Sequence, residues 1–144
     1  MFHQDSVFNT FENNLAYNNT DNFVIYASNY NQIVKNRSFN AKNNHIRINA
    51  GSVNNFVTDN IFAGGKSGVY AYGNVKNIYV SGNKFYGLEY NLKTSEADMI
   101  LFANNKVDEL NYKLNENDRV VFGPNTIERQ APEVPSEVGG LDTN

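Results

Sequence analysis

The stretch Phe11-Glu12-Asn13-Asn14-Leu15-Ala16-Tyr17-Asn18-Asn19 pairs apolar residues with asparagines in a pattern that fits no ordinary helix. Four further stretches repeat its central feature, an asparagine followed two or three residues later by an apolar residue. The apolar residues that close the five copies are spaced by 22, 23, 23 and 22 residues. A period of this size, held over five units, indicates a repeat architecture. These closing residues are Tyr17, Phe39, Phe62, Phe85 and Val107.

A second apolar piece recurs on the same period, with centres at Val24, Ile46 and Val69. The piece His45–Asn49 alternates polar and apolar residues, which is typical of a half-buried strand. A third apolar piece leads into each asparagine motif. Three short strands per 22–23 residues predict an all-β fold, a right-handed parallel β-helix of about five coils. The expected inward residues are Val24, Tyr26, Ile46, Ile48, Val69 and Ala71.

Asparagine is unusually frequent, at 27 residues, and it favours turns over helix interiors. One asparagine recurs in each coil, so we expect these side chains to stack as an internal ladder, each amide bonding the coils on either side. The spacing slips by one residue between Asn36 and Asn60, which predicts a small bulge in that coil. The expected ladder is Asn14, Asn36, Asn60, Asn83 and Asn105.

The regular pattern fades after residue 92. We read residues 93–98 as a loop inserted between coils, and residues 110–114 with 119–122 as a last, irregular coil. From residue 130 the chain has two prolines, several acidic residues and few apolar ones. The predicted organisation is therefore a β-helix over residues 1–129 and a flexible tail over residues 130–144.

The charge is unevenly distributed. Residues 1–88 hold seven Lys/Arg and four Asp/Glu (+3), and residues 89–144 hold five and eleven (−6), which sum to the net −3. A mildly basic face would attract an acidic polymer, whereas nucleic acid is not indicated because no dense basic cluster occurs. The chain has no long apolar run for a membrane span and no signal-peptide pattern. It has no cysteine, which excludes disulfides and thiolate metal sites.

By simple alternation, the second strands present one outer face. Arg47, with Lys42 and Lys66 in adjoining turns, would hold a carboxylate, and Tyr70 or Tyr72 would stack on a sugar ring. His45 is a candidate general base. The alternative is that all of these are ordinary exposed strand residues, and no metal site is apparent. The expected outward residues are Phe23, Ile25, Ala27, His45, Arg47, Asn49, Gly68, Tyr70 and Tyr72.

Asp5-Ser6-Val7-Phe8, followed by the stretch from Phe11 to Asn19, resembles the catalytic module of the mannuronan C5-epimerases. These are secreted parallel β-helix enzymes that convert mannuronate to guluronate within alginate. The resemblance implies an acidic polysaccharide as partner, and Ca²⁺ as the only cofactor it suggests. The repeats alone are less specific, because pectate lyases, periplasmic carbohydrate-binding β-helix proteins and phage tailspikes share them.

The family's catalytic motif, Asp-Pro-His-Glu-Gln-Thr, does not occur in this sequence, and neither does its further catalytic Asp. The resemblance therefore implies the downstream coils of such a module, and no catalytic residue carries over. We expect the chain to bind alginate weakly without turning it over. Because no cap precedes the first coil, we expect either further coils upstream or association through the N-terminal end. The alternatives are a tailspike or adhesin segment and a non-catalytic scaffold.

Overall fold

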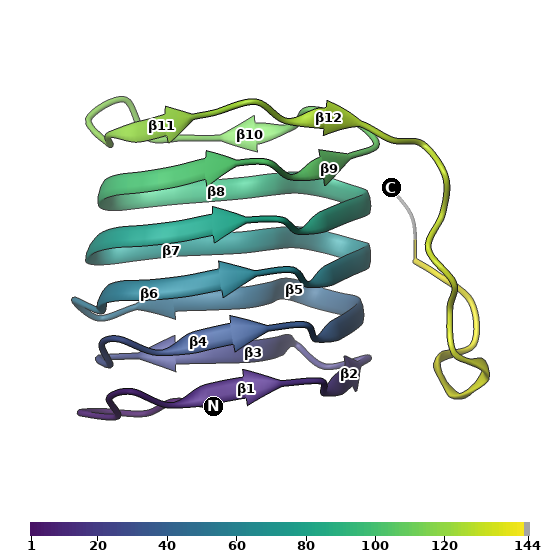
Figure 1. Cartoon of the computed structure of the whole chain (residues 1–144), viewed down its shortest axis with the longest axis horizontal. Helices are drawn as coiled ribbons and strands as arrows, with labels where there is room; N and C mark the ends of the chain where they lie inside the picture. Colours follow the sequence, from purple (N-terminus) through teal and green to yellow (C-terminus); the bar gives the residue numbers. More distant parts are fainter. Residues whose placement is uncertain (143–144) are drawn as a thin grey trace.

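The computed structural model describes residues 1–142, in which parallel strands wind into a stack of coils (Figure 1). The described residues contain one short 3₁₀ helix and no helix that is long and apolar enough to cross a membrane. The strands are β1 (Thr10–Glu12), β2 (Leu15–Tyr17), β3 (Asp21–Tyr26), β4 (Gln32–Val34), β5 (Arg37–Asn49), β6 (Val53–Thr58), β7 (Ile61–Ser81), β8 (Lys84–Ala103), β9 (Lys106–Val107), β10 (Tyr112–Lys113), β11 (Val120–Phe122) and β12 (Thr126–Ile127), and the helix is η1 (Ser136–Val138).

Each coil contributes one strand segment to each of three sheets. The front sheet holds β1, β4, β6, the last parts of β7 and β8, and β11. The side sheet holds β2, the first parts of β5, β7 and β8, and then β9 and β12. The back sheet holds β3, later parts of β5, β7 and β8, and β10. The chain runs right along the front and left along the back while climbing, so the winding is right-handed (Figure 1). The predicted parallel β-helix is confirmed.

The core lies inside the coils and is built from rows of equivalent residues. On the side sheet, the rings of Phe62 and Phe85 stand 5.1 Å apart, and across the core Phe85 lies 5.3 Å from Phe102 of the front sheet. On the back sheet, Ile46 is in register with Val69 and Leu92 follows, all fully buried. One coil is too small to bury its own apolar side chains, so these rows form only when coils stack.

The predicted asparagine ladder is present at the corner between the front and side sheets. Asn60 shows the pattern: its Oδ1 accepts hydrogen bonds from the backbone N–H (2.8 Å) and Nδ2 (3.1 Å) of Asn36. Its own Nδ2 donates to the Ile33 carbonyl at 2.8 Å and to Asn83 Oδ1 at 3.0 Å. Each inner amide thus satisfies backbone groups that a corner would otherwise leave unpaired.

The ladder extends further than expected, and a second one exists. Asn105 donates from its backbone N–H to Asn125 Oδ1 at 3.0 Å, which adds a sixth rung. At another corner, Asn31 Oδ1 accepts from the backbone N–H of Asn9 (3.0 Å), and Asn55 Oδ1 accepts from that of Asn31 (2.9 Å). The second ladder ends where Asn55 meets Ile78 in register.

The register of the first coil differs from our expectation. Phe23 pairs with Ile46 and Ile25 with Ile48, a spacing of 23, and both side chains are buried in the core. The predictions that Val24 and Tyr26 point inward, and that Phe23 and Ile25 point outward, were wrong. The reason is an extra residue in β5 after Phe39, since Tyr17 pairs with Phe39 but Asp21 pairs with Asn44.

The bulge predicted from the asparagine spacing is confirmed, because the β5–β7 register shifts between Ala41 and Asn44. The predicted loop at residues 93–98 was wrong. Those residues belong to β8, where Lys93 pairs with Tyr70 and Asp98 pairs with Lys76. The irregular last coil is present as β10 and β11, which pair with β8.

Residues 130–142 run down the outside of the side sheet and then turn back up along it (Figure 1). Val138 is buried against Phe39 and Ala63, and Val134 and Leu141 pack beside it. We predicted a flexible tail over residues 130–144, and the packing of Val138 was not anticipated. The last two residues, 143 and 144, lie outside the described part of the chain.

Replacing Asn60 by leucine should destabilise the fold. The change leaves the backbone N–H of Asn36 and the carbonyl of Ile33 without their partners inside the coil stack. Each orphaned buried group costs about 1–3 kcal/mol. Urea unfolding should show a loss of free energy of that size or more for Asn60→Leu. The exposed Asn117→Leu serves as the control, and equal stability of the two variants would contradict the ladder's role.

Candidate functional site

The outward side chains of the back sheet form rows along the stack. One row runs Val24, Arg47, Tyr70, Lys93 and Lys113, each in register with the next. Neighbouring coils are about 4.8 Å apart, as in any sheet. The row therefore places one cation on each of three coils, with Tyr70 interposed between Arg47 and Lys93. The neighbour of Arg47 on the coil below is Val24, and not the expected outward residue Ile25.

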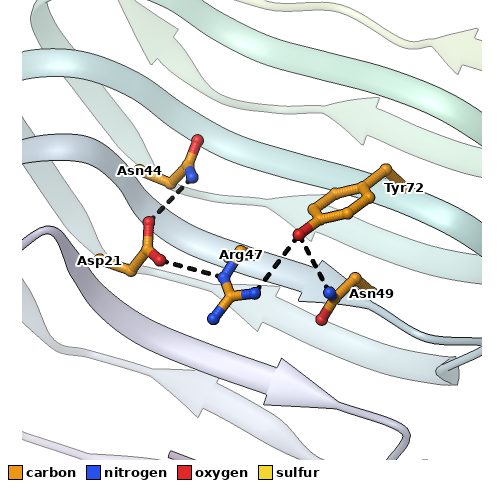
Figure 2. Close-up of polar contacts among 5 residues, drawn as sticks. All are labelled: Asp21, Asn44, Arg47, Asn49 and Tyr72. Atoms are coloured by element: carbon orange, nitrogen blue, oxygen red, sulfur yellow. Dashed lines mark hydrogen bonds and ion pairs between the residues drawn. The ribbon is translucent and has the colours of Figure 1, made fainter.

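The lower part of this face is a closed polar network (Figure 2). The Arg47 guanidinium forms an ion pair with Asp21, with 3.0 Å between Nε and Oδ2, and donates to the Tyr72 hydroxyl at 3.3 Å. Asn49 Nδ2 donates to the same hydroxyl at 3.0 Å, and Asn44 Nδ2 donates to Asp21 at 2.9 Å. The bond to Tyr72 and the charge of Asp21 raise the pKa of Arg47. Arg47 is thus charged but already paired.

The upper part of the face holds three lysines for which the described residues provide no ion pair: Lys66, Lys93 and Lys113. The Lys93 ammonium lies 4.6 Å from the centre of the Tyr70 ring, and the Lys113 ammonium lies 5.6 Å from that of Tyr90. Partial burial, then the charges of Lys113 and Lys66, lower the pKa of Lys93. Lys93 is repelled by both of the other ammonium groups, with Glu89 acting in the opposite direction, so an anion placed beside Lys93 would be stabilised.

Two hollows meet at these lysines. The first, of about 220 Å³, lies beside Lys66, Tyr70 and Lys93. The second, of about 340 Å³, lies beside Tyr70, Lys93 and Lys113. Because they share Tyr70 and Lys93, we treat them as one groove, the lysine groove. No residue that lines either hollow is a histidine, aspartate or glutamate.

Tyr70 is already engaged through its ring. Tyr72 stacks on it with 4.3 Å between ring centres, and Lys93 lies over it. A sugar ring that stacks on Tyr70, as the sequence suggested, would have to displace one of these neighbours. The aromatic pair is better described as a support that holds Lys93 at the groove.

His45 does not lie on the outer face, and that prediction was wrong. It is fully buried, with Nδ1 2.6 Å from Ser38 Oγ and Nε2 2.7 Å from the Gly64 carbonyl oxygen. Since the carbonyl can only accept, Nε2 carries the proton and Ser38 donates to Nδ1. Ser38 sits in the row of Phe62 and Phe85, so a small residue there leaves room for the imidazole. Burial lowers the pKa of His45 to about 4.

The remaining sequence-predicted residues divide by position. Lys66 and Tyr70 line the groove, whereas Asn49, Tyr72 and Arg47 form the network beside it. Lys42 is exposed but lines neither hollow, and Gly68, expected outward, is buried. Sequence reasoning missed Lys93, Lys113 and Tyr90. The spacing of 23 from Tyr70 to Lys93 was the available signal.

The resemblance to the epimerases suggested Ca²⁺ as a cofactor. In the described part of the chain, no three or more His, Cys, Asp or Glu side chains gather where they could hold a metal ion. A dedicated Ca²⁺ site takes about six to eight oxygen ligands. The ammonium groups of the lysine groove cannot ligate a cation, so the groove itself does not fit such a site.

Comparison of the chain with known protein families, curated proteins and solved structures finds no match.

The burial of His45 makes stability depend on pH. The unfolded chain binds a proton at His45 below about pH 6.5, whereas the folded chain does so only near pH 4. The free energy of unfolding is therefore independent of this histidine above pH 6.5. It decreases by about 3 kcal/mol as the pH falls from 6.5 to 4, because the unfolded chain takes up a proton that the folded chain does not. Urea unfolding of His45→Gln should lack this part of the pH dependence. The exposed His3→Gln should retain it, and identical profiles of wild type and His45→Gln would refute the assignment.

Proposed function

We propose that this chain binds an acidic polysaccharide of the polyuronate type along the lysine groove, as the downstream part of a mannuronan C5-epimerase-like module. The observation that supports it best is the set of unpaired ammonium groups at the two adjoining hollows, where Lys93 is shared by both. Carboxylates are their natural partners, through charge-assisted hydrogen bonds. A relative of that family would work outside the cell.

The geometry suits a regular linear polyanion. Lys93 and Lys113 are in register on adjacent coils, so their spacing follows the coil repeat of about 4.8 Å. A polyuronate carries one carboxylate on every sugar and likewise presents its charges at a constant interval. The polar side chains of Asn43, Ser95 and Asn115 line the same hollows, are at least partly exposed, and offer hydrogen bonds to sugar hydroxyls.

A short oligomannuronate should bind in a saturable way, and Lys93→Met should weaken it. Loss of a hydrogen bond to a charged group costs about 1.5–3 kcal/mol, which corresponds to a roughly 10- to 100-fold rise in Kd. Isothermal titration calorimetry measures both affinities. Raising the salt concentration should also weaken wild-type binding, because the contacts are ionic.

Lys35→Met is the matched control, since Lys35 is exposed and lines neither hollow. It should bind like the wild type, and a neutral oligosaccharide of equal length should not bind. Absence of saturable binding by the wild type would favour the scaffold alternative and reject the proposal. A trimer in light scattering, with no polyuronate binding, would favour a tailspike or adhesin segment.

The chain alone should not turn the polymer over. Epimerisation and elimination both begin with removal of the proton at C5, and neither hollow offers an imidazole or carboxylate to take it. Alginate incubated with the chain in heavy water should acquire no deuterium at C5 and no unsaturated ends, as followed by NMR. Deuterium incorporation above a protein-free control would contradict this expectation.

A further inference from the structure

The C-terminal segment 134–142, here called the strap, is held on the side sheet by an apolar anchor. Val138 inserts against Phe39 and Ala63, which are outward residues of that sheet. Val134 and Leu141 pack beside Val138 in the same cluster. The strap is therefore anchored on the side sheet by three apolar side chains, with Val138 at their centre.

Beyond Val138 the strap is held through its backbone. Asn40, itself almost fully buried, donates from Nδ2 to the Gly140 carbonyl at 2.7 Å and accepts from the Asp142 N–H at 2.8 Å. The Asp142 carbonyl in turn accepts a hydrogen bond from the Gly65 N–H at 2.6 Å. Asn40 thus pairs with the strap much as an adjacent strand would.

The contacts of the strap restrain one side of the segment formed by Gly64 and Gly65. Gly64 and Gly65 have φ of +71° and +112°, and a Cβ at Gly64 would lie 2.4 Å from Asn40 Oδ1 and 3.1 Å from the Asp142 N. On its other side, the Gly64 carbonyl accepts from His45 Nε2. The backbone of residues 64–65 is therefore clamped between the strap and a buried histidine. The next residue in the chain is Lys66, at the mouth of the lysine groove.

We infer that the strap is a positioning element for the polyanion site: by binding Gly65, it fixes the backbone that aims Lys66 into the lysine groove. The inference rests on the proposed function. Gly65 lies in β7 in register with Ala41 and Leu88 of the neighbouring coils, and the strap adds a further restraint on this segment. Glycine has more backbone freedom than any other residue, so we expect that restraint to matter here. Without the strap, residues 64–66 would be held less tightly, whereas Lys93 and Lys113, on β8 and β10, would be unaffected.

A double-mutant cycle tests this coupling in the full-length chain. Val138→Asp places a carboxylate in the apolar anchor and should release the strap. In the wild-type background it should weaken oligomannuronate binding about three- to fivefold, the effect expected for one exposed ionic contact. In a Lys66→Met background it should have no further effect, because its action passes through Lys66. Val121→Asp, on the opposite front sheet, adds the same charge and should leave binding unchanged.

Hydrogen exchange supplies a readout that does not depend on the ligand. Release of the strap should speed exchange of the Gly65 amide about fivefold, while the amides of Ile46 and Val69 stay protected. Asn40→Asp keeps the shape of the side chain but removes its donor to Gly140, so it should act in the same direction. This second variant keeps the test valid if Val138→Asp fails to fold.

The outcomes separate the two proposals. If the wild type binds and Val138→Asp binds equally well, the strap inference is overturned and the proposed function stands. An equal loss of affinity in the Lys66→Met background would also overturn the inference, because the strap would then act by another route. If the wild type does not bind at all, both fall.

Discussion

The structure depends on one interaction, the hydrogen bond between asparagine amides of neighbouring coils. A chain that turns a corner in every coil leaves backbone N–H and C=O groups that no strand can pair. The amide has donors on one atom and an acceptor on the other, so each inner Asn of the main ladder satisfies the coil on either side and its own corner. Coils of slightly different length can then stack in register, and core rows such as Ser38, Phe62, Phe85 and Val107 follow.

The register between neighbouring coils also determines where the candidate site lies. Because equivalent residues stand one coil apart, outward positions become rows along the stack, and the row through Arg47 continues to Lys93 and Lys113. The two ends of that row differ in their electrostatics. Arg47 is neutralised by Asp21 inside a closed network, whereas the lysines above it have only aromatic rings for support. The same sheet thus contains a structural cation and a set of cations available to a ligand.

The ladder and the fold were predictable because their signal repeats: Asn36, Asn60 and Asn83 recur with apolar neighbours on one period. Individual side-chain directions were less predictable. One extra residue in β5 puts Phe39 in register with Ala63 rather than Phe62, and it reverses the expected orientation of Phe23. His45 is buried because Ser38 replaces a core phenylalanine, a compensation between two residues that alternation does not reveal.

Lys93 and Lys113 were missed because their coils lack the apolar pattern that marked the others, although the period of 23 still reaches Lys93 from Tyr70. The strap was missed for a related reason. Its packing rests on three isolated apolar residues, with Val138 at their centre, and on backbone bonds to Asn40, and backbone recognition carries almost no sequence signature. The parts of the site that derive from stacking were thus accessible from the sequence, and the parts that derive from single tertiary contacts were not.

The most direct test of the account is to map binding on the folded chain in solution. Two-dimensional NMR of the ¹⁵N-labelled protein, titrated with a short oligomannuronate, reports each backbone amide separately. The account predicts saturable shifts concentrated at Lys66, Tyr70, Lys93 and Lys113 on the back sheet. Shifts concentrated instead on the front sheet, around Phe56 and Tyr79, or no shifts at saturating ligand, would contradict it.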